Sequence, residues 1–328
     1  MMIDRKAIIC MCLLSLQFGL QPTLTRTFTP DGVCRSTIVL MQEALKFCFA
    51  YIMLRISGGK RAAVAGWTPS QWIRVAFAPA ALYALQNMAA LKAYQHLDSL
   101  TFNVLNQTKT LSAALCCYLV MGKRQSFMQI ISLILLLLSA LTMEGLVPLN
   151  YLMSQSSIDA SPSQVDWNSA HWSNGVAPIL LASFISGLSG ALSQRNLQSS
   201  GGGRNPYLFS MELCSASILI LGSSLLFSSD GKRVAEDGFW AGWVPQLWIP
   251  ITTNAIGGII VGLVTKYAGS VRKGFALIFG IFLSGVVQAM LDQNHGISRE
   301  QVTGGVLAGV SLWVHATHPY QSKKMKSE

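Results

Sequence analysis

Apolar residues dominate the chain in long runs, and short polar connectors separate these runs. The runs are about 20 residues long, which is the length that an α-helix needs to cross the hydrocarbon core of a bilayer. Ten such stretches cover, approximately, residues 7–24, 36–56, 72–94, 99–121, 126–149, 176–196, 206–227, 244–267, 272–292 and 299–317. The pattern predicts an all-α integral membrane protein with ten transmembrane helices packed as one bundle.

The predicted spans divide into two groups of five around the longest polar loop, residues 148–175. Because each group has an odd number of spans, the two groups must have opposite orientations in the membrane. This arrangement predicts two inverted repeats, about 7–149 and 176–317, within one transmembrane domain, 1–320. A basic cytosolic tail, 321–328, follows. The repeat prediction depends on the number of spans alone.

Composition agrees with a membrane protein and limits its possible partners. Charged residues make up 12% of the chain, whereas a soluble domain has about 25%. The formal net charge is +10, but most basic residues lie in one set of connectors and at the two ends of the chain. This asymmetry follows the positive-inside rule and predicts that both termini are cytosolic. We therefore expect membrane lipid around the protein, and no nucleic-acid partner.

The sequence carries no motif for catalysis, for a metal or for a cofactor. It lacks a G-x-S-x-G elbow, a Walker loop and a dinucleotide fingerprint. The seven cysteines lie almost entirely within predicted spans and show neither metal-ligand spacing nor a disulfide framework. We expect a protein that is not an enzyme and that needs no cofactor or metal.

The densest cluster of polar residues inside the predicted spans surrounds Lys109. A charged side chain at the centre of a bilayer costs roughly 2.5–3.5 kcal/mol on insertion scales, so it normally faces a partner, a cavity or a ligand. The other members of the cluster are Tyr83, Gln86, Asn87, Asn106 and Gln107. Spacings of three and four residues place the amides of the fourth span on one broad helix face. We interpret this cluster as the lining of a cavity that accepts an anion.

Two further sets of charged residues lie in or beside the spans. Lys273 begins the ninth span shortly after Lys266, and anchoring of the helix ends would explain both charges. The backbone N–H groups at a helix start also favour an anion, which supports ligand binding by Lys273. Glu43 and Lys46 lie three residues apart and can pair on one face of the second span. Their pairing fits either a structural ion pair or a role in gating or coupling, which Lys266 would share.

These residues together resemble the motifs of a known family. The similar segments are Tyr83-Ala84-Leu85-Gln86-Asn87, Gln107-Thr108-Lys109, Gly257-Gly258, Lys266-Tyr267 and Lys273-Gly274-Phe275. They resemble nucleotide-sugar transporters of the CMP-sialic acid, UDP-galactose and UDP-N-acetylglucosamine group, in the drug/metabolite transporter superfamily. The resemblance covers nearly the whole chain. It is strongest to plant members assigned to UDP-N-acetylglucosamine and UDP-N-acetylgalactosamine transport in the endoplasmic reticulum.

The resemblance implies an antiporter that exchanges a cytosolic nucleotide sugar for a lumenal nucleoside monophosphate. It implies that Lys109 and Lys273 bind phosphates, and that Gln86 and Asn87 help to form the nucleotide pocket. We also assign Ser210, Glu212 and Gly258 to substrate binding. In the seventh span, sialic-acid transporters carry an Asn and a Tyr, where this chain has Ser210 and Cys214, with Glu212 between them. Sialic-acid transporters have a Tyr-Thr-Ser stretch in the eighth span, where this chain has Ile260-Val261-Gly262. These departures argue against CMP-sialic acid and favour a UDP-N-acetylhexosamine by analogy.

The last residues of the chain bear on its location. Lys324 and Lys326 resemble a cytosolic KxKxx retrieval signal, which indicates the endoplasmic reticulum or Golgi membrane, although a generic basic anchor would also explain them. The sequence leaves open the transport of UDP-galactose, UDP-glucose, CMP-sialic acid or another organic anion. It also leaves open a transport-inactive scaffold for glycosyltransferases. Helix surfaces rich in Gly and Ser permit a homodimer without requiring one.

Overall fold

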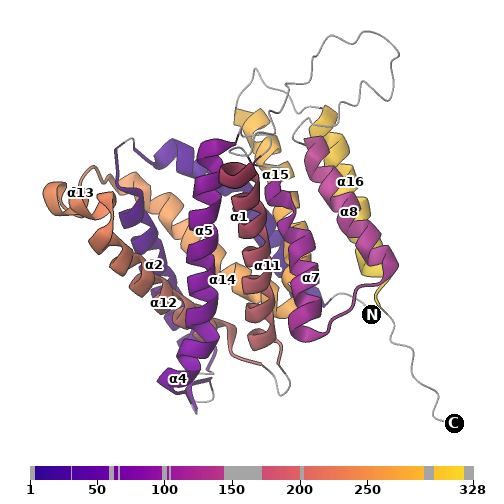
Figure 1. The fold of residues 1–328 in the computed structure, drawn as a ribbon, viewed down its shortest axis with the longest axis horizontal. Coiled ribbons are helices and arrows are strands. Elements are labelled where there is room, and N and C mark those ends of the chain that lie inside the picture. The colour runs from indigo at the N-terminus through magenta and orange to yellow at the C-terminus, as the bar shows by residue number, and fades with distance from the viewer. Residues whose placement is uncertain are drawn as a thin grey trace, which may run out of the picture. The chain divides into compact units, whose positions relative to one another are not determined.

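Helices form the whole of the described architecture in the computed structural model. The structure describes residues 4–30, 32–58, 63–65, 67–97, 102, 105–143, 172–199, 203–291 and 299–320, and these contain no β-strand (Figure 1). The helices are α1 (Arg5–Phe28), α2 (Arg35–Ile56), α4 (Pro69–Trp72), η1 (Ile73–Phe77), α5 (Ala78–His96), α7 (Lys109–Met121), α8 (Phe127–Met143), η2 (Trp172–Val176), α11 (Ala177–Leu197), α12 (Pro206–Phe227), α13 (Ser229–Asp237), η3 (Pro245–Leu247), α14 (Trp248–Tyr267), α15 (Ser270–Leu291) and α16 (Arg299–Thr317).

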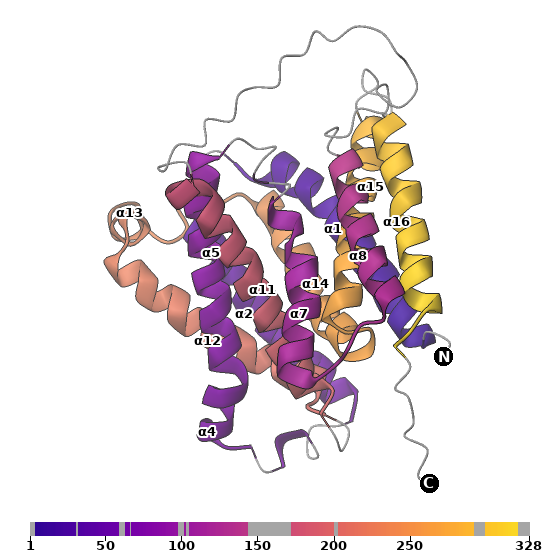
Figure 2. The same cartoon turned by 45° about the vertical axis from the view of Figure 1, so that its right-hand side comes forward.

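Two compact units divide the chain, and each combines two separate stretches of sequence. The first unit joins Met1–Leu85 to Ser189–His295, and the second joins Gln86–Leu188 to Gly296–Glu328. In the first unit, α1 packs along α14 and α15, and α2 packs along α12 and α14. In the second unit, α8 and α16 lie side by side, as Figures 1 and 2 both show.

Small residues let these helices approach closely. Ser15 of α1 donates a hydrogen bond from its hydroxyl to the carbonyl of Ala276 in α15, at 2.8 Å. One turn further along α1, a Cβ atom added to Gly19 would lie only 3.0 Å from the carbonyl oxygen of Gly280. Two serine-to-carbonyl bonds join α8 to α16 in the same way. Such contacts are typical of helices that associate in a bilayer, where packing and hydrogen bonds replace the hydrophobic drive.

Local sequence signals set several helix ends. The side chain of Asn205 accepts hydrogen bonds from the N–H groups of Tyr207 and Leu208, so it caps α12, and Pro206 occupies the first helical position. Both features favour a helix start. At its C-terminal end, α7 stops at Gly122, whose φ of 66° lies in the left-handed region that glycine adopts without strain.

Six helices among the described residues are long and apolar enough to cross a membrane. They are Arg5–Phe28, Arg35–Ile56, Trp172–Leu197, Pro206–Phe227, Pro245–Tyr267 and Ser270–Leu291, and they match six predicted spans. The other four predicted stretches also contain helices, but α7 has 13 residues and α8 has 17. The all-helical membrane architecture is confirmed, whereas the count of ten and the inverted repeats stay predictions. The short helix α13 was not predicted.

Candidate functional site

Lys109 is the first residue of α7 and is half-buried in the second unit. The sequence predicted a continuous helix over 99–121; in the structure residues 105–107 are also helical, and Thr108, with φ of −60° and ψ of −14°, lies between them and α7. Thr108 donates its hydroxyl hydrogen to the carbonyl of Leu105 at 2.6 Å, and Ser183 of α11 donates to the same carbonyl at 3.3 Å. Lys109 therefore brings a half-buried ammonium to the point where this helical stretch changes.

The polar neighbours of Lys109 in the sequence differ in exposure. Gln107 is buried and Asn106 is half-buried just before α7. On α5, Asn87 is exposed, while Tyr83 and Gln86 are half-buried. The side-chain oxygen of Gln86 is itself buried, and no described residue donates a hydrogen bond to it. Because a buried carbonyl without a donor is costly, Gln86 is suited to a ligand that brings its own N–H or O–H group.

Two glutamines, Gln194 on α11 and Gln198 just after it, hold the turn between α14 and α15 in the first unit. The side-chain oxygen of Gln194 accepts the N–H of Ser270, the first residue of α15, at 2.8 Å, and its amide donates to Gln198 at 2.9 Å. The amide of Gln198 in turn donates to the carbonyl of Lys266 at 2.7 Å. Gly269, inside the turn, has a φ of +88°, and a Cβ atom there would lie 2.8 Å from the Gln194 amide nitrogen.

This turn sets the position of Lys273, which is half-buried in the first turn of α15. Its backbone N–H donates to the carbonyl of Gly269 at 3.1 Å. The hydroxyl of Ser270 donates to the carbonyl of Gly190 on α11 at 2.7 Å, and a Cβ atom added to Gly190 would lie 4.0 Å from the Lys273 ammonium. Lys273 therefore occupies a helix start whose register is held by α11, and Lys109 likewise begins a helix.

Glu43 and Lys46 form the ion pair that their spacing predicts. Their carboxylate and ammonium are 2.5 Å apart on α2, and both side chains are largely buried. The stem of Lys46 lies against Gly258 of α14, where an added Cβ atom would collide with it, and the thiol of Cys214 on α12 lies beside its ammonium. The second carboxylate oxygen of Glu43 is buried, and no described residue bonds to it. The pair thus joins three membrane-spanning helices.

Glu212, on α12, forms a second ion pair, which the sequence did not predict. Its side chain is 4% exposed and binds the guanidinium of Arg204 through both carboxylate oxygens. The indole N–H of Trp67 also donates to the carboxylate, at 2.7 Å. Trp72 donates to the backbone carbonyl of Glu212 and to the hydroxyl of Ser215. The carboxylate assigned to substrate binding is therefore already neutralised and hydrogen-bonded.

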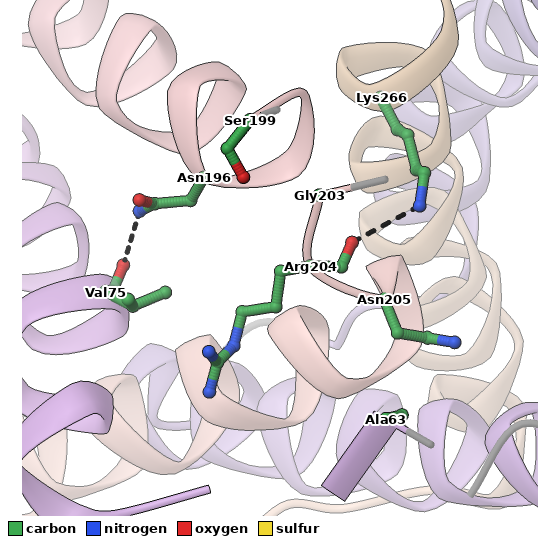
Figure 3. A pocket seen from close by; sticks show the side chains of 8 residues that line it. All are labelled: Ala63, Val75, Asn196, Ser199, Gly203, Arg204, Asn205 and Lys266. Carbon is green, nitrogen blue, oxygen red and sulfur yellow. Dashed lines mark hydrogen bonds between the residues drawn. The ribbon is translucent and has the colours of Figure 1, made fainter. Parts of the chain in front are cut away.

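A polar cavity of about 490 Å³ lies beside this ion pair (Figure 3). Its lining residues come from the ends of α11, α12 and α14 and from the segments around Ala63 and Val75. The ammonium of Lys266 donates to the backbone carbonyl of Arg204 at 3.3 Å, and the amide of Asn196 donates to that of Val75 at 3.2 Å. Lys266, predicted to act in gating or coupling, is thus tied to the segment that carries Arg204.

Comparison with protein families decides what kind of molecule this is. The family model described as nucleotide-sugar transporter matches residues 2–316. The chain belongs to the nucleotide-sugar transporter family. It is a multi-pass membrane protein of a transporter family, and not an enzyme.

Several known transporters are similar along most of this family member's length. A UDP-N-acetylglucosamine transporter of Arabidopsis thaliana, ROCK1, is 33% identical over 317 residues, which cover 96% of this chain and 93% of the relative. The UDP-galactose translocator of Mus musculus is 28% identical and covers 82% of this chain and 67% of its own. A UDP-N-acetylglucosamine transporter of Rattus norvegicus is 25% identical, with 76% and 73% covered.

A solved crystal structure shares the fold of this transporter. It covers 94% of this chain and 95% of its own with a TM-score of 0.65, at 12% sequence identity. At this identity the likeness concerns the fold alone.

The structure brings some of the transporter's predicted site residues together within the first unit and adds new ones. Glu43, Lys46 and Gly258 are in contact, and Ser210 lies opposite Gly262, with its hydroxyl donating to the carbonyl of Pro206 at 2.9 Å. Lys266 and Glu212 are linked through Arg204. Lys324 and Lys326 lie outside the described residues.

Sequence reasoning missed Arg204, Trp67, Gln194 and Gln198 in this transporter. Two signals would have found three of them. An acid inside a span requires a cation, and Arg204 is the basic residue that directly precedes the seventh span. Gln194 and Gln198 are two amides four residues apart at the end of an apolar helix, which places them on one face. Trp67 had no such signal, because a tryptophan near a span is typical of the membrane interface.

Proposed function

We propose that this transporter moves a UDP-N-acetylhexosamine, UDP-N-acetylglucosamine or UDP-N-acetylgalactosamine, from the cytosol into the lumen of the endoplasmic reticulum or Golgi in exchange for UMP. The observation that carries the proposal is the 33% identity to a plant UDP-N-acetylglucosamine transporter across 96% of the chain. The departures from sialic-acid transporters in the seventh and eighth spans support a UDP-sugar over CMP-sialic acid.

The proposed architecture has ten spans in two inverted repeats, about 7–149 and 176–317, with both termini in the cytosol. Six apolar helices of spanning length and the helices in the other four stretches support the count. The distribution of basic residues supports the orientation. With a cytosolic C-terminus, Lys324 and Lys326 would be available as a retrieval signal.

The proposed phosphate ligands are Lys109 and Lys273. Lys273 lies in the first turn of α15, where the helix end and the ammonium attract the same anion, and Lys109 adds a half-buried ammonium at the first residue of α7. Lysine acts as a point charge, which suits a pyrophosphate that must also be released. Gln86 supports the nucleotide pocket, because its buried oxygen has no donor among the described residues. We assign Tyr83, Asn87, Asn106 and Gln107 to the same pocket.

The two ion pairs receive different roles in the proposal. Glu43 and Lys46 would couple movements of α2, α12 and α14, because their contacts reach all three helices. Ser210 and Gly258 keep their assignment to substrate binding. Glu212 has its carboxylate bound by Arg204 and Trp67, which supports a role in holding the connecting segments over direct substrate contact.

Transport by purified protein in liposomes tests the substrate. Vesicles preloaded with UMP would be supplied with labelled UDP-N-acetylglucosamine, UDP-N-acetylgalactosamine, UDP-galactose, UDP-glucose and CMP-sialic acid in turn. We expect uptake of the two N-acetylhexosamine nucleotides above the others. Preferred uptake of UDP-galactose would favour the second candidate function, which the 28% identity to UDP-galactose translocators supports. Folded protein that carries none of these would favour the glycosyltransferase scaffold.

A further inference from the structure

A basic polar cavity in the first unit lies beside the last residues of α11 and α14 and the first residues of α12. Lys266 is one residue from the end of α14, Asn205 directly precedes α12, and Ser199 follows α11. No acidic residue is among the described residues that line it, and the charge of its one arginine, Arg204, is matched by Glu212. Among the described residues that line this cavity of about 490 Å³, Lys266 therefore carries the charge that no acidic partner matches, and the lining also has amide and hydroxyl groups (Figure 3).

A second, apolar groove of about 420 Å³ is lined by Glu212, the partner of Arg204. Its walls are formed mainly by Phe47, Val64, Trp67, Trp72, Leu208 and Met211. The two polar residues that line it, Glu212 and Ser215, already bind Arg204, Trp67 and Trp72. Because these polar groups have partners, the groove is suited to hydrocarbon and not to a polar ligand.

The linings of the cavity and of the groove adjoin at two places. Ala63 lines the cavity and the next residue, Val64, lines the groove, while Arg204 lines the cavity and its partner Glu212 lines the groove. Phe47 lies nine residues before the end of α2, so the groove reaches about 14 Å into the span at 1.5 Å per residue. A polar, positively charged compartment at the helix ends therefore lies next to an apolar one that extends along the span of α2.

We propose that this composite site binds an anionic membrane phospholipid, with its headgroup phosphate at Lys266 and one acyl chain in the groove lined by Phe47, Trp67 and Trp72. An amphiphile fits because neither compartment alone matches both chemistries. The ammonium of Lys266 favours a headgroup that keeps its phosphate charge, such as phosphatidylinositol or phosphatidic acid, over phosphatidylcholine, whose choline cancels it. The bound lipid would hold the segments that carry Val64, Trp67 and Arg204 against α12.

Thermal unfolding of the purified full-length protein in detergent, with added lipid, tests the site without measuring transport. We expect phosphatidic acid and phosphatidylinositol to raise the Tm more than phosphatidylcholine does. In Lys266→Gln the apparent Kd for the anionic lipids should rise about tenfold or more, because a hydrogen bond to a charged group is lost. Arg55→Gln is the matched control: Arg55 is an exposed cation on the last turn of α2 and does not line the cavity, so its lipid response should equal that of the native protein.

A second variant tests the groove and covers the case in which Lys266→Gln fails to fold. Val64→Trp fills the groove from a position that is 42% exposed, so the core is left intact, and we expect it to weaken binding of the anionic lipids. An unchanged lipid response in Lys266→Gln or in Val64→Trp would overturn the proposal. Inorganic pyrophosphate and UMP serve as soluble probes. Stabilisation by these probes that equals that of lipid, depends on Lys266 and survives Val64→Trp would show a free-phosphate site and would also overturn it.

Discussion

The two-glutamine contact between α11 and the α14–α15 turn yields a prediction whose size follows from the structure. In Gln194→Leu the side chain keeps a similar volume but loses the oxygen that accepts the N–H of Ser270 at 2.8 Å. Ser270 is 3% exposed, so no water replaces that oxygen. Leaving a buried N–H without an acceptor costs about 1–3 kcal/mol, which corresponds to roughly 5- to 150-fold in an equilibrium constant.

Because we propose that Lys273 binds phosphate, the lost hydrogen bond should appear as weaker binding of the nucleotide sugar. Ser270 begins the helix that carries Lys273, so a displaced helix start should weaken binding of the nucleotide sugar. We expect the apparent KM for UDP-N-acetylglucosamine uptake to rise by roughly fivefold or more in Gln194→Leu, with a smaller change in kcat. The assay is concentration-dependent uptake into liposomes preloaded with UMP, and the Tm of the same protein is measured in parallel.

Two variants separate positioning from general damage. Gln194→Glu keeps an oxygen that accepts the Ser270 N–H, so it should restore much of the native KM, although it loses donation to Gln198. Gln71→Leu removes an exposed amide elsewhere in the first unit and should change neither KM nor Tm. If Gln194→Leu has the native KM and the native Tm, the turn does not position Lys273. A lower Tm with an unchanged KM would show a structural role only.

The remaining predictions concern the two lysines and the two ion pairs. Lys109→Ala and Lys273→Ala should each reduce uptake about tenfold or more with normal expression, because each loses a charge-assisted contact, and native uptake by both would remove the phosphate role. Arg204→Ala should lower the free energy of unfolding by about 3–5 kcal/mol, since it leaves a buried carboxylate unpaired; equal Tm values for Arg204→Ala and the native protein would show that the pair is not stabilising. The double variant that adds Glu212→Leu should recover much of that loss. Gly258→Ala should cost about 1–3 kcal/mol and reduce uptake, because its Cβ atom collides with the stem that the ion pair holds, and full activity at native Tm would contradict this.

The hydrophobic pattern predicted the helices well, because an apolar segment that crosses the bilayer must satisfy its backbone N–H and C=O groups internally, and a helix does so. Six predicted spans match helices of membrane-crossing length, and their bounds agree to within a few residues. The start of α7 at Lys109 was not predicted, because an apolar run gives no information about a local change such as the turn at Thr108. The polar helix α13 lacks a hydrophobic pattern of spanning length, so apolar runs do not predict it.

The candidate site was only partly predictable, because many of its contacts join residues that are far apart in the sequence. Glu43 and Lys46 are three residues apart on one helix, so their pairing follows from helix geometry. Contacts such as Trp67 with Glu212 join segments far apart in the sequence, and their pairing depends on helix packing that one sequence does not specify. The sequence therefore identified which polar residues lie inside spans, but not which partners they contact.

Release of internal UMP is the most direct test of the proposed exchange of a nucleotide sugar for UMP. Liposomes that contain the protein and labelled UMP would be diluted into buffer with or without external UDP-N-acetylglucosamine, and the label that leaves the vesicles would be measured over time. We expect rapid UMP efflux with the external nucleotide sugar, little efflux without it, and loss of the difference in Lys273→Ala. UMP efflux that is equally fast in both buffers, or absent in both from folded protein, would contradict exchange.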